Sequence, residues 1–430
     1  MLRSNGGRGV VLGLAVAVCA AGAACSPSHT GPRAALAPDS LALRRDIFYL
    51  ASDALAGRLT GTPGNDSAAA YIARRYAALG LRSISPGYLQ RFVARPPVHG
   101  GQSPSLPTQN VFALLPGRDP SLRGQYVVIG AHFDHLGTST DGALDPELKG
   151  AVRRGADDNA SGTAAVLELA RLLSAAPTRR SIIFVNFSGE EEGLLGSAYF
   201  VDHSPVPIDS IDAMLNFDMV GRLKNDKLIV YGITTAKELP SLLDSATASS
   251  GLRVTAQGDG FGASDQSSFF AKDIPVLHFF TDLHDDYHRA SDIPEHINAA
   301  GEARVVAVAE RVAREIADRT PRLSFVRAVA AAPVSATREG SEVYLGSIPD
   351  MAGGDTPGLR LTGVRAGSPA DIAGLKAGDV IVEFGGKPVK DLFEYSNALY
   401  AHKPGDEVSV VVLRGGQRAT LQVKLGKRGS

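Results

Sequence analysis

The chain has 430 residues, with 44 basic and 45 acidic side chains and 44% hydrophobic residues. It is longer than one typical domain, so we expect at least two folding units. A formal net charge of -1 removes the usual electrostatic basis for nucleic-acid binding, and a mean hydropathy of +0.00 excludes a chain made of many membrane spans. The two cysteines, Cys19 and Cys25, both lie near the N-terminus, which excludes a disulfide framework or a cysteine zinc site elsewhere.

The N-terminus has the pattern of an export signal. Arg3 and Arg8 flank the start of a small and apolar run, Val10 to Ala24, that is too short to span a bilayer. The residues before Cys25 resemble a bacterial lipobox, which implies cleavage there and lipidation of Cys25. We therefore expect an exported lipoprotein that faces the periplasm or the cell exterior and contacts the membrane only through its lipid anchor. Plain secretion and an uncleaved anchor stay open, because Gly22 stands where lipoboxes usually have a larger aliphatic residue.

The rest of the chain divides into a tether, a large domain, a linker and a small domain. After the signal at 1–25, segment 26–40 has the Pro- and Ser-rich composition of a flexible tether, and segment 321–341 that of a linker. Segment 41–320 alternates strands and helices, which predicts a three-layer α/β/α domain with a mostly parallel mixed sheet. Segment 342–428 is rich in short strands, which predicts a small β-rich domain.

Apolar periodicity predicts the individual elements. Expected helices in the large domain are Leu41–Leu81, interrupted by a loop at Gly57–Gly64, Ala160–Ala175, Gly193–Asp202, Leu239–Ser250 and Ile297–Arg319. Expected strands there are Tyr126–Ala131, Ser181–Phe187, Ala213–Phe217, Lys227–Tyr231 and Ile274–Phe280. The stretch Arg91–Gln109 is expected to be a short loop. The small domain should hold strands Tyr344–Ser347, Leu359–Val364, Val380–Phe384, Glu407–Arg414 and Ala419–Leu425, with helices Ala370–Leu375 and Leu392–Ala401.

Histidine and carboxylate side chains lie in five successive connections of the large domain. They are found in His132–His135, Asp157–Asp158, Glu190–Glu192, Asp218 and Asp282–His288. Because ligands bind beyond the carboxyl ends of the strands of an open α/β sheet, we expect these side chains to converge. One carboxylate after a strand is usually an ordinary helix N-cap, but so many together would repel one another without cations. Mixed histidine and carboxylate ligands suit Zn²⁺ or a similar divalent metal.

The same stretches resemble the motifs of the M28 family of zinc aminopeptidases. The matching segments are Gly130–Asp134, Gly155–Gly162, Glu190–Ser197, Phe217–Met219 and Tyr287–Asp292, in the family's order. The resemblance extends from about Leu41 to about Arg319. It implies an exopeptidase that holds two Zn²⁺ per chain and removes N-terminal residues from peptides with a free N-terminus.

The resemblance also implies a ligand set for the two metals. Asp157 would bridge them. His132 and Asp218 would complete one site, and Glu191 and His288 would complete the other.

Further roles follow from the same resemblance. Glu190 would be the general base, and Tyr287 would donate a hydrogen bond to the tetrahedral intermediate. Asp134 and Asp292 would accept the free ring N–H groups of the ligand histidines, and Asp158 would also lie just outside the ligand set.

Four other polar residues near these motifs are expected to lie outside the ligand set. His135 and His284 are expected in surface or hydrogen-bonded loop roles, and His278 as a hydrogen-bonded histidine inside an apolar strand. Gln266 stands where the family commonly has histidine, which affects a substrate contact and not the metal site. The family further implies a cis peptide bond directly after Asp157.

The small domain resembles a bacterial PDZ domain at Gly367–Ile381 and Tyr344–Pro349. The resemblance implies a C-terminal peptide ligand that adds as a strand beside Leu345 and Gly346, with its carboxylate bound by backbone N–H groups. A PDZ fold kept without a ligand stays open.

Two other functions remain alternatives. A single-zinc enzyme similar to glutaminyl cyclase is disfavoured by the five-ligand set with Asp157. A non-catalytic PDZ scaffold on a peptidase fold is disfavoured by the presence of Glu190. A serine protease is excluded, because Asn159–Gly162 only superficially resembles a nucleophile loop and no Gly-x-Ser-x-Gly elbow is present.

Overall fold

The protein is described here from a computed structural model. The described residues are 9–10, 36–96, 104–326 without 259, 261 and 263, and 343–427 without 350–357, 365–366, 390–393, 396–397 and 400. Cys25, the expected signal apart from residues 9–10, and most of the expected linker lie outside them. No helix in this described part of the chain has both the length and the apolarity needed to cross a membrane.

The large domain is built on one eight-stranded sheet in the order β1-β2-β4-β3-β5-β8-β6-β7. Its strands are β1 (Leu89–Ala94), β2 (Leu106–Leu115), β3 (Tyr126–His132), β4 (Ser181–Phe187), β5 (Ile211–Phe217), β6 (Lys227–Tyr231), β7 (Arg253–Gln257) and β8 (Val276–Phe280). The central strands β4, β3, β5 and β8 run parallel. β1 and β2 add antiparallel at one edge, and β6 pairs antiparallel with β8 and parallel with β7. The carboxyl ends of the central strands therefore meet at one edge.

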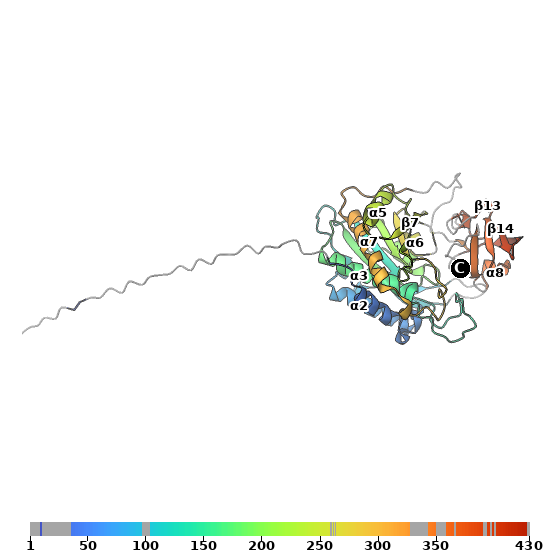
Figure 1. The fold of residues 1–430 in the computed structure, drawn as a ribbon, viewed down its shortest axis with the longest axis horizontal. Helices are drawn as coiled ribbons and strands as arrows, with labels where there is room; N and C mark the ends of the chain where they lie inside the picture. Colours follow the sequence, from blue (N-terminus) through green and yellow to red (C-terminus); the bar gives the residue numbers. More distant parts are fainter. Residues whose placement is uncertain are drawn as a thin grey trace, which may run out of the picture. The chain divides into compact units, whose positions relative to one another are not determined.

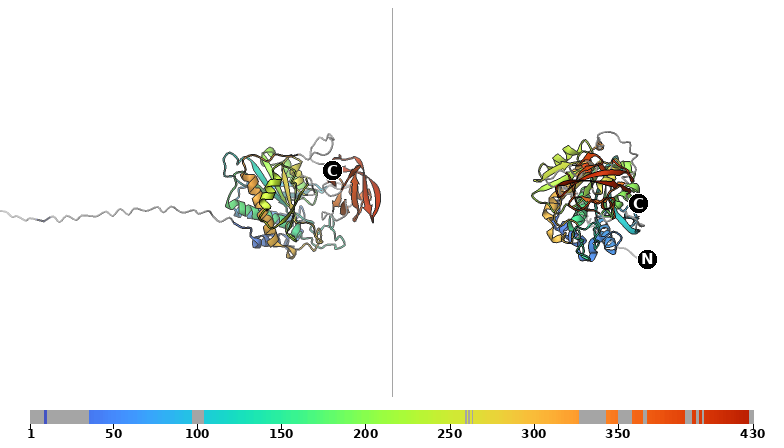
Figure 2. Two further views of the ribbon diagram at one scale, coloured as in Figure 1. Left: turned by 45° about the horizontal axis from the view of Figure 1, so that its top comes forward. Right: turned by 90° about the vertical axis from the view of Figure 1, so that its right-hand side faces the viewer.

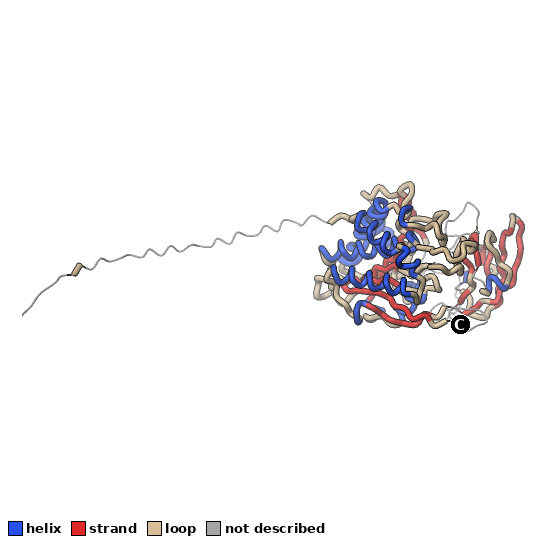
Figure 3. Tube along the Cα trace, turned by 90° about the horizontal axis from the view of Figure 1, so that it is seen from below, coloured by secondary structure: helices blue, strands red, loops and turns tan. Residues whose placement is uncertain are grey.

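Helices cover both faces of this sheet (Figures 1 and 2). They are α1 (Ser40–Leu50), α2 (Pro63–Ala78), α3 (Gly162–Ala175), α4 (Leu195–Asp202), α5 (Leu239–Thr247), α6 (Gln266–Phe270) and α7 (Ala299–Asp318). β4 is buried along its whole length because its side chains alternate between two cores. Ile182 and Phe184 join the core formed with α1, α2, α3, α5 and α7, whereas Ile183 and Val185 join the core formed with α4 and α6. The predicted three-layer fold is confirmed, and Figure 3 shows its helices against its strands.

The helix ends follow ordinary capping chemistry. Thr62 accepts a side-chain hydrogen bond from the backbone of Asn65 at the start of α2, and Asn298 accepts one from Gly301 at the start of α7. Between α1 and α2 lies a 3-10 helix, Asp53–Arg58, whose last two residues fall in the loop predicted at Gly57–Gly64.

The expected loop at Arg91–Gln109 is wrong at both ends. β1 and β2 occupy residues 89–94 and 106–115, and they pair with each other in an antiparallel register. β2 carries the polar residues Gln109 and Asn110, which interrupt its apolar pattern, yet both are buried. Asn110 donates to the carbonyl of Gly196 at 2.8 Å, so tertiary hydrogen bonds satisfy a side chain that the pattern assigns to solvent.

The small domain is β-rich, as predicted. Its sheet follows the order β10-β11-β12-β14-β15, with β13 beside β12, and β9 pairs with β16. The strands are β9 (Val343–Tyr344), β10 (Ser347–Pro349), β11 (Leu359–Val364), β12 (Val380–Phe384), β13 (Lys387–Pro388), β14 (Glu407–Arg414), β15 (Gln417–Lys424) and β16 (Gly426–Lys427). One short helix, α8 (Pro369–Ile372), stands where the sequence predicts Ala370–Leu375. The domain has its own apolar core, which includes Leu345, Ile381 and Val410.

Candidate metal centre

The ends of the central strands bring the candidate ligands to one place. His132 is the last residue of β3, Asp218 directly follows β5, and Glu190 and Glu191 follow β4 after a two-residue turn. β3 is paired in parallel with both β4 and β5. His288 reaches the same edge from the loop after β8. The topology therefore explains why residues distant in sequence converge.

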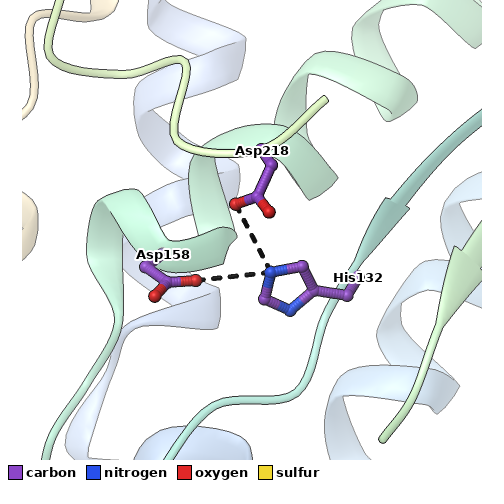
Figure 4. Close-up of side chains that lie close together, drawn as sticks. All are labelled: His132, Asp158 and Asp218. Carbon is purple, nitrogen blue, oxygen red and sulfur yellow. Dashed lines mark ion pairs between the residues drawn. The ribbon is translucent and has the colours of Figure 1, made fainter. Parts of the chain in front are cut away.

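One cluster consists of His132, Asp158 and Asp218 (Figure 4). The Nε2 atom of His132 lies 3.3 Å from Oδ1 of Asp158 and 3.4 Å from Oδ1 of Asp218. His132 and Asp158 are buried, and the side chain of Asp218 is largely so. All three side chains point toward a common centre.

A second cluster uses the other oxygen of the same aspartate. The Nε2 atom of His288 lies 3.0 Å from Oδ2 of Asp158 and 3.3 Å from Oε2 of Glu191. Asp158 thus belongs to both clusters, one through each carboxylate oxygen.

The spacing of these atoms fits a divalent metal. In a tetrahedral site with bonds of about 2.0–2.1 Å, ligand atoms lie about 3.3–3.4 Å apart. The separations from His132 to Asp158 and Asp218, and from His288 to Asp158 and Glu191, are 3.0–3.4 Å. Nitrogen and carboxylate donors are the types that Zn²⁺ binds. The residues present therefore fit two zinc ions that share Asp158.

Electrostatics points the same way. Burial opposes protonation of His132, but the carboxylates of Asp218 and Glu190 raise its pKa well above its usual value. Burial likewise opposes protonation of His288, and Glu191 and Asp158 raise its pKa to about 9. The clustered carboxylates thus favour positive charge at this position, which a bound cation would provide in place of the protons.

Asp157 does not take the bridging position that the resemblance implies. Its Oδ1 accepts the backbone N–H of Gly221 at 2.7 Å, and its Oδ2 lies 3.2 Å from Nε2 of His284. Asp157 and Asp158 belong to one irregular helical turn, Ala156–Ser161, in which Asp158 departs from helical dihedral angles, so neighbouring side chains diverge. The cis peptide bond also lies one residue later than expected, between Asp158 and Asn159.

Asp292 supports the backbone of this turn. Its Oδ2 accepts the backbone N–H groups of Asp157 at 2.9 Å and Asp158 at 3.1 Å. The Nδ1 atom of His288 instead lies 2.8 Å from the carbonyl oxygen of Gly142. Asp292 therefore orients Asp158 through its backbone, in contrast to the expected contact with a ligand histidine.

Asp134 supports the loop after β4. Its carboxylate accepts the backbone N–H groups of Glu190 at 3.2 Å and Glu191 at 3.3 Å, and the hydroxyl of Thr60 at 3.1 Å. The Nδ1 atom of His132 lies 3.3 Å from the backbone carbonyl of Asp134 and 3.7 Å from its carboxylate. Asp134 thus contacts both the histidine it was expected to orient and the Glu-Glu pair.

The two residues predicted to act on substrate both lie beside the clusters. Oε2 of Glu190 is 4.0 Å from Nε2 of His132. Burial raises the pKa of Glu190 well above its usual value, and the nearby carboxylate of Glu191 adds to this increase, whereas His132 opposes it. The ring of Tyr287 stacks on His288 with 3.9 Å between centroids. Burial first and then the carboxylates raise the pKa of Tyr287 well above its usual value, so its phenol stays protonated.

Arg58 is a site residue that the sequence reasoning missed. Its fully buried guanidinium donates to the carbonyls of Phe133, Leu50, Arg154 and Gly155 at 2.6–2.9 Å. The carbonyl of Phe133 belongs to the residue after His132, and those of Arg154 and Gly155 lie just before the Asp157–Asp158 turn. Burial lowers the pKa of Arg58 to about 10, against the carboxylates of the site. In the sequence, Arg58 stands out only as an arginine within the glycine-containing Gly57–Gly64 stretch, and this pattern does not reveal which carbonyls it contacts.

Of the other polar residues near the motifs, His135, His278 and Gln266 are buried and His284 is half-buried. His135 is fully buried, which contradicts a surface role, and His284 contacts Asp157. His278 is buried in β8, but its Nε2 has no hydrogen-bond partner among the described residues. Gln266 accepts a hydrogen bond at 3.1 Å from Asn216, within a polar network beside Asp218.

In the small domain, Leu345 and Gly346 lie between β9 and β10, as the PDZ resemblance requires. Leu345 is buried in the core, and Gly346 has a φ of +79°. β10 is the end strand of its sheet among the described strands. An end strand has backbone groups that a further strand can pair with.

Comparison with known proteins agrees with both domains. The chain matches peptidase family M28 over residues 110–313 and a PDZ domain over residues 334–425. It is 36% identical to the alkaline phosphatase isozyme conversion protein of Escherichia coli (strain K12) over 141 residues, which cover 33% of this chain and 40% of that protein. It is 32% identical to aminopeptidase YwaD of Bacillus subtilis (strain 168) over 186 residues, which cover 39% of this chain and 40% of that protein.

Solved structures share the fold of the large domain. BSAP, a zinc aminopeptidase from Bacillus subtilis, superposes with a TM-score of 0.54 at 17% identity, covering 67% of this chain and 97% of that chain. Bacteroides thetaiotaomicron glutaminyl cyclase bound to N-acetylhistamine also gives a TM-score of 0.54 at 17% identity, covering 65% and 98%. At such identities the likeness establishes the fold alone. The matches to the two curated relatives span about two fifths of their length. The chain therefore carries a peptidase family M28 domain at residues 110–313 and a C-terminal PDZ domain at residues 334–425.

Proposed function

We propose that the chain is a two-zinc aminopeptidase that hydrolyses the N-terminal peptide bond of peptides with a free N-terminus. The observation that carries the proposal is the position of Asp158, whose two carboxylate oxygens belong to two separate metal-ligand clusters. His132 and Asp218 would complete one zinc site, and Glu191 and His288 the other. When bound, the two ions would supply Lewis-acid activation of the scissile carbonyl and of the attacking water.

The protein's own residues would move the protons. Glu190 lies beside the His132 cluster, where it would accept a proton from water and pass it to the leaving amine. Its raised pKa in the metal-free protein would fall beside two cations, because opposite charges favour the ionised carboxylate. Tyr287 would donate its phenolic hydrogen to the oxyanion of the tetrahedral intermediate, for which its protonated state is required.

The test compares Glu190→Gln with Glu192→Gln, a neighbour in the same Glu-Glu-Glu run. We expect Glu190→Gln to keep two equivalents of zinc and to lose on the order of 10²–10⁴-fold in kcat on aminoacyl anilides. Glu192→Gln should stay close to the wild type. Wild-type turnover by Glu190→Gln would contradict the proposed mechanism.

The cyclase alternative makes a different prediction. A single-zinc enzyme would bind one equivalent of metal and release ammonia from peptides with N-terminal glutamine, without cutting aminoacyl anilides. The similarity to a glutaminyl cyclase extends to the fold, but two clusters sharing Asp158 favour two metals. A scaffold without activity would turn over neither substrate.

We propose two further properties that rest on sequence patterns. The PDZ domain would bind the C-terminus of a peptide beside Leu345 and Gly346. Export and lipidation of Cys25 would hold the enzyme at a membrane surface, outside the cytoplasm. Cell fractionation of a Cys25→Ser variant tests the anchor, since that variant should move from the membrane fraction to the soluble exported fraction.

A further inference from the structure

His135 lies in the loop after β3, against the second cluster. Its side chain is fully buried, and its Nδ1 atom lies 2.7 Å from Oε1 of Glu191. Its Nε2 atom has no hydrogen-bond partner among the described residues. With Asp158 and Glu191, His135 also forms a group close enough to hold a metal. The ring therefore either binds the metal or orients a residue that does.

The distances distinguish these two roles. Tetrahedral ligand atoms lie about 3.3–3.4 Å apart. His288 satisfies this spacing, at 3.0 Å from Asp158 and 3.3 Å from Oε2 of Glu191. His135 does not, since its Nδ1 lies 3.8 Å from Oδ2 of Asp158 and 2.7 Å from the other Glu191 oxygen, Oε1. A separation of 2.7 Å is that of a strong hydrogen bond to a carboxylate.

The number of ligands leads to the same conclusion. Glu191, His288 and Asp158 already give the second metal three protein ligands. Catalytic zinc sites keep a position open for water or substrate, whereas four protein ligands are typical of closed structural sites. A fourth ligand from His135 would close the position that the proposed hydrolysis needs.

The surroundings hold the ring in one orientation. Gly155 faces the imidazole so closely that a Cβ at this position would overlap the ring atoms of His135. The ring of His288 packs edge-on against it, with 5.7 Å between centroids. The absence of a side chain at Gly155 thus makes room for His135 between the two loops.

We propose that His135 is a positioning residue that donates its Nδ1–H to Oε1 of Glu191, so that Glu191 offers only Oε2 to the second metal. This inference rests on the proposed two-metal function. The hydrogen bond keeps Glu191 from binding with both oxygens and so preserves the open position. Loss of such a contact behind a metal ligand typically weakens metal binding by about 10–100-fold.

The test titrates Co²⁺ alone into the chelator-stripped full-length chain and follows binding by calorimetry and visible absorption. His135→Ala should bind one Co²⁺ as the wild type does and the other about 10–100-fold more weakly. His135→Asn places an amide N–H near the original Nδ1 and should restore the affinity to within about threefold, whereas His135→Gln, whose amide reaches the Nε2 position, should not. His203→Ala, at an exposed histidine, controls for loss of any imidazole.

Each result decides the matter. Equal Co²⁺ affinities of the wild type and His135→Ala would overturn the inference. So would an Asn variant as weak as the Gln variant, with an altered spectrum of one ion, since His135 would then be a ligand. If His135→Ala does not fold, the comparison of Asn with Gln still separates the two roles. Fewer than two Co²⁺ in the wild type would instead contradict the proposed function.

Discussion

The carboxylates of Asp157 and Asp158 are neighbours in the sequence but serve different partners. Asp158 lies between His132 and His288, with its oxygens 3.3 and 3.0 Å from their Nε2 atoms. Asp157 accepts the backbone N–H of Gly221 at 2.7 Å. Both carboxylates are buried, so burial does not distinguish them. The direction of the side chains in the Ala156–Ser161 turn does, and it makes Asp158 the candidate for the shared ligand.

We therefore predict opposite effects for two matched substitutions. Asp158→Asn removes the negative charge shared by both clusters, so the purified protein should hold fewer than two equivalents of zinc and lose at least about 100-fold in activity. Asp157→Asn keeps an oxygen that can accept the Gly221 N–H, so it should retain both zinc ions. Elemental analysis after dialysis, with aminoacyl-anilide hydrolysis, measures both effects. Metal loss confined to Asp157→Asn would reverse the assignment.

The sequence predicts the central fold because its signals there are local. β4 is an uninterrupted apolar run, and α7 has a clear apolar stripe, so both elements are found within two residues of their predicted ends. β2 was missed because Gln109 and Asn110 are satisfied by groups far away in the sequence. A local pattern does not contain such tertiary hydrogen bonds.

The site follows the same division. The sequence predicts that His132, Asp218 and His288 converge, because each follows a strand of a parallel sheet whose carboxyl ends meet at one edge. The one-residue shift from Asp157 to Asp158 depends on the dihedral angles of an irregular turn, which residue types do not reveal. The contacts of Arg58 depend on four carbonyl groups from three separate segments, which only the folded chain assembles.

Arg58 should be essential to the stability of the catalytic domain. Its guanidinium donates to four backbone carbonyls, and a buried carbonyl left without its donor costs about 1–3 kcal/mol. Arg58→Met should therefore lower the free energy of unfolding by about 3 kcal/mol or more. Urea denaturation followed by far-UV circular dichroism measures this loss, because the chain has no tryptophan for fluorescence detection. Lysine carries its N–H donors on a single nitrogen and cannot reach four carbonyls that Arg58 contacts through three nitrogens, so Arg58→Lys should recover little of this loss.

The exposed Arg74 on α2 provides the comparison for this effect. Arg74→Met removes the same charge at the surface and should change the free energy of unfolding by less than about 0.5 kcal/mol. Similar losses in both variants would attribute the effect to net charge and not to the buried hydrogen bonds.

His278 should make the metal-free protein sensitive to acid. Burial in β8 lowers its pKa from 6.5 to about 4, so the folded protein favours the neutral ring. The resulting stability is fully present above pH 6.5 and is lost as the pH falls from 6.5 toward 4, to a total of about 3 kcal/mol. Urea denaturation in the presence of a chelator at pH 7 and pH 4.5 should show this loss.

The matched variant is His278→Phe, which keeps an aromatic ring beside Tyr231 and Phe280. It removes the titrating group, so its free energy of unfolding should fall less between the two pH values than that of the wild type. Other acid-sensitive groups contribute equally to both proteins. An identical fall in both would show that His278 does not titrate in this range.

Gly346 should control peptide binding by the PDZ domain. It has a φ of +79°, and a Cβ there would overlap the side chain of Ser368. Gly386 has a similar φ of +78° but open space around it, so Gly386→Ala has the backbone cost without the overlap. We expect Gly346→Ala to weaken binding of labelled peptides with a free C-terminal carboxylate by at least about tenfold, and Gly386→Ala to have a smaller effect.

Fluorescence anisotropy measures the affinities, and aminoacyl-anilide hydrolysis should be unchanged in both variants. Equal losses of affinity would mean that backbone strain in the domain, and not the shape of the loop at Leu345 and Gly346, limits binding.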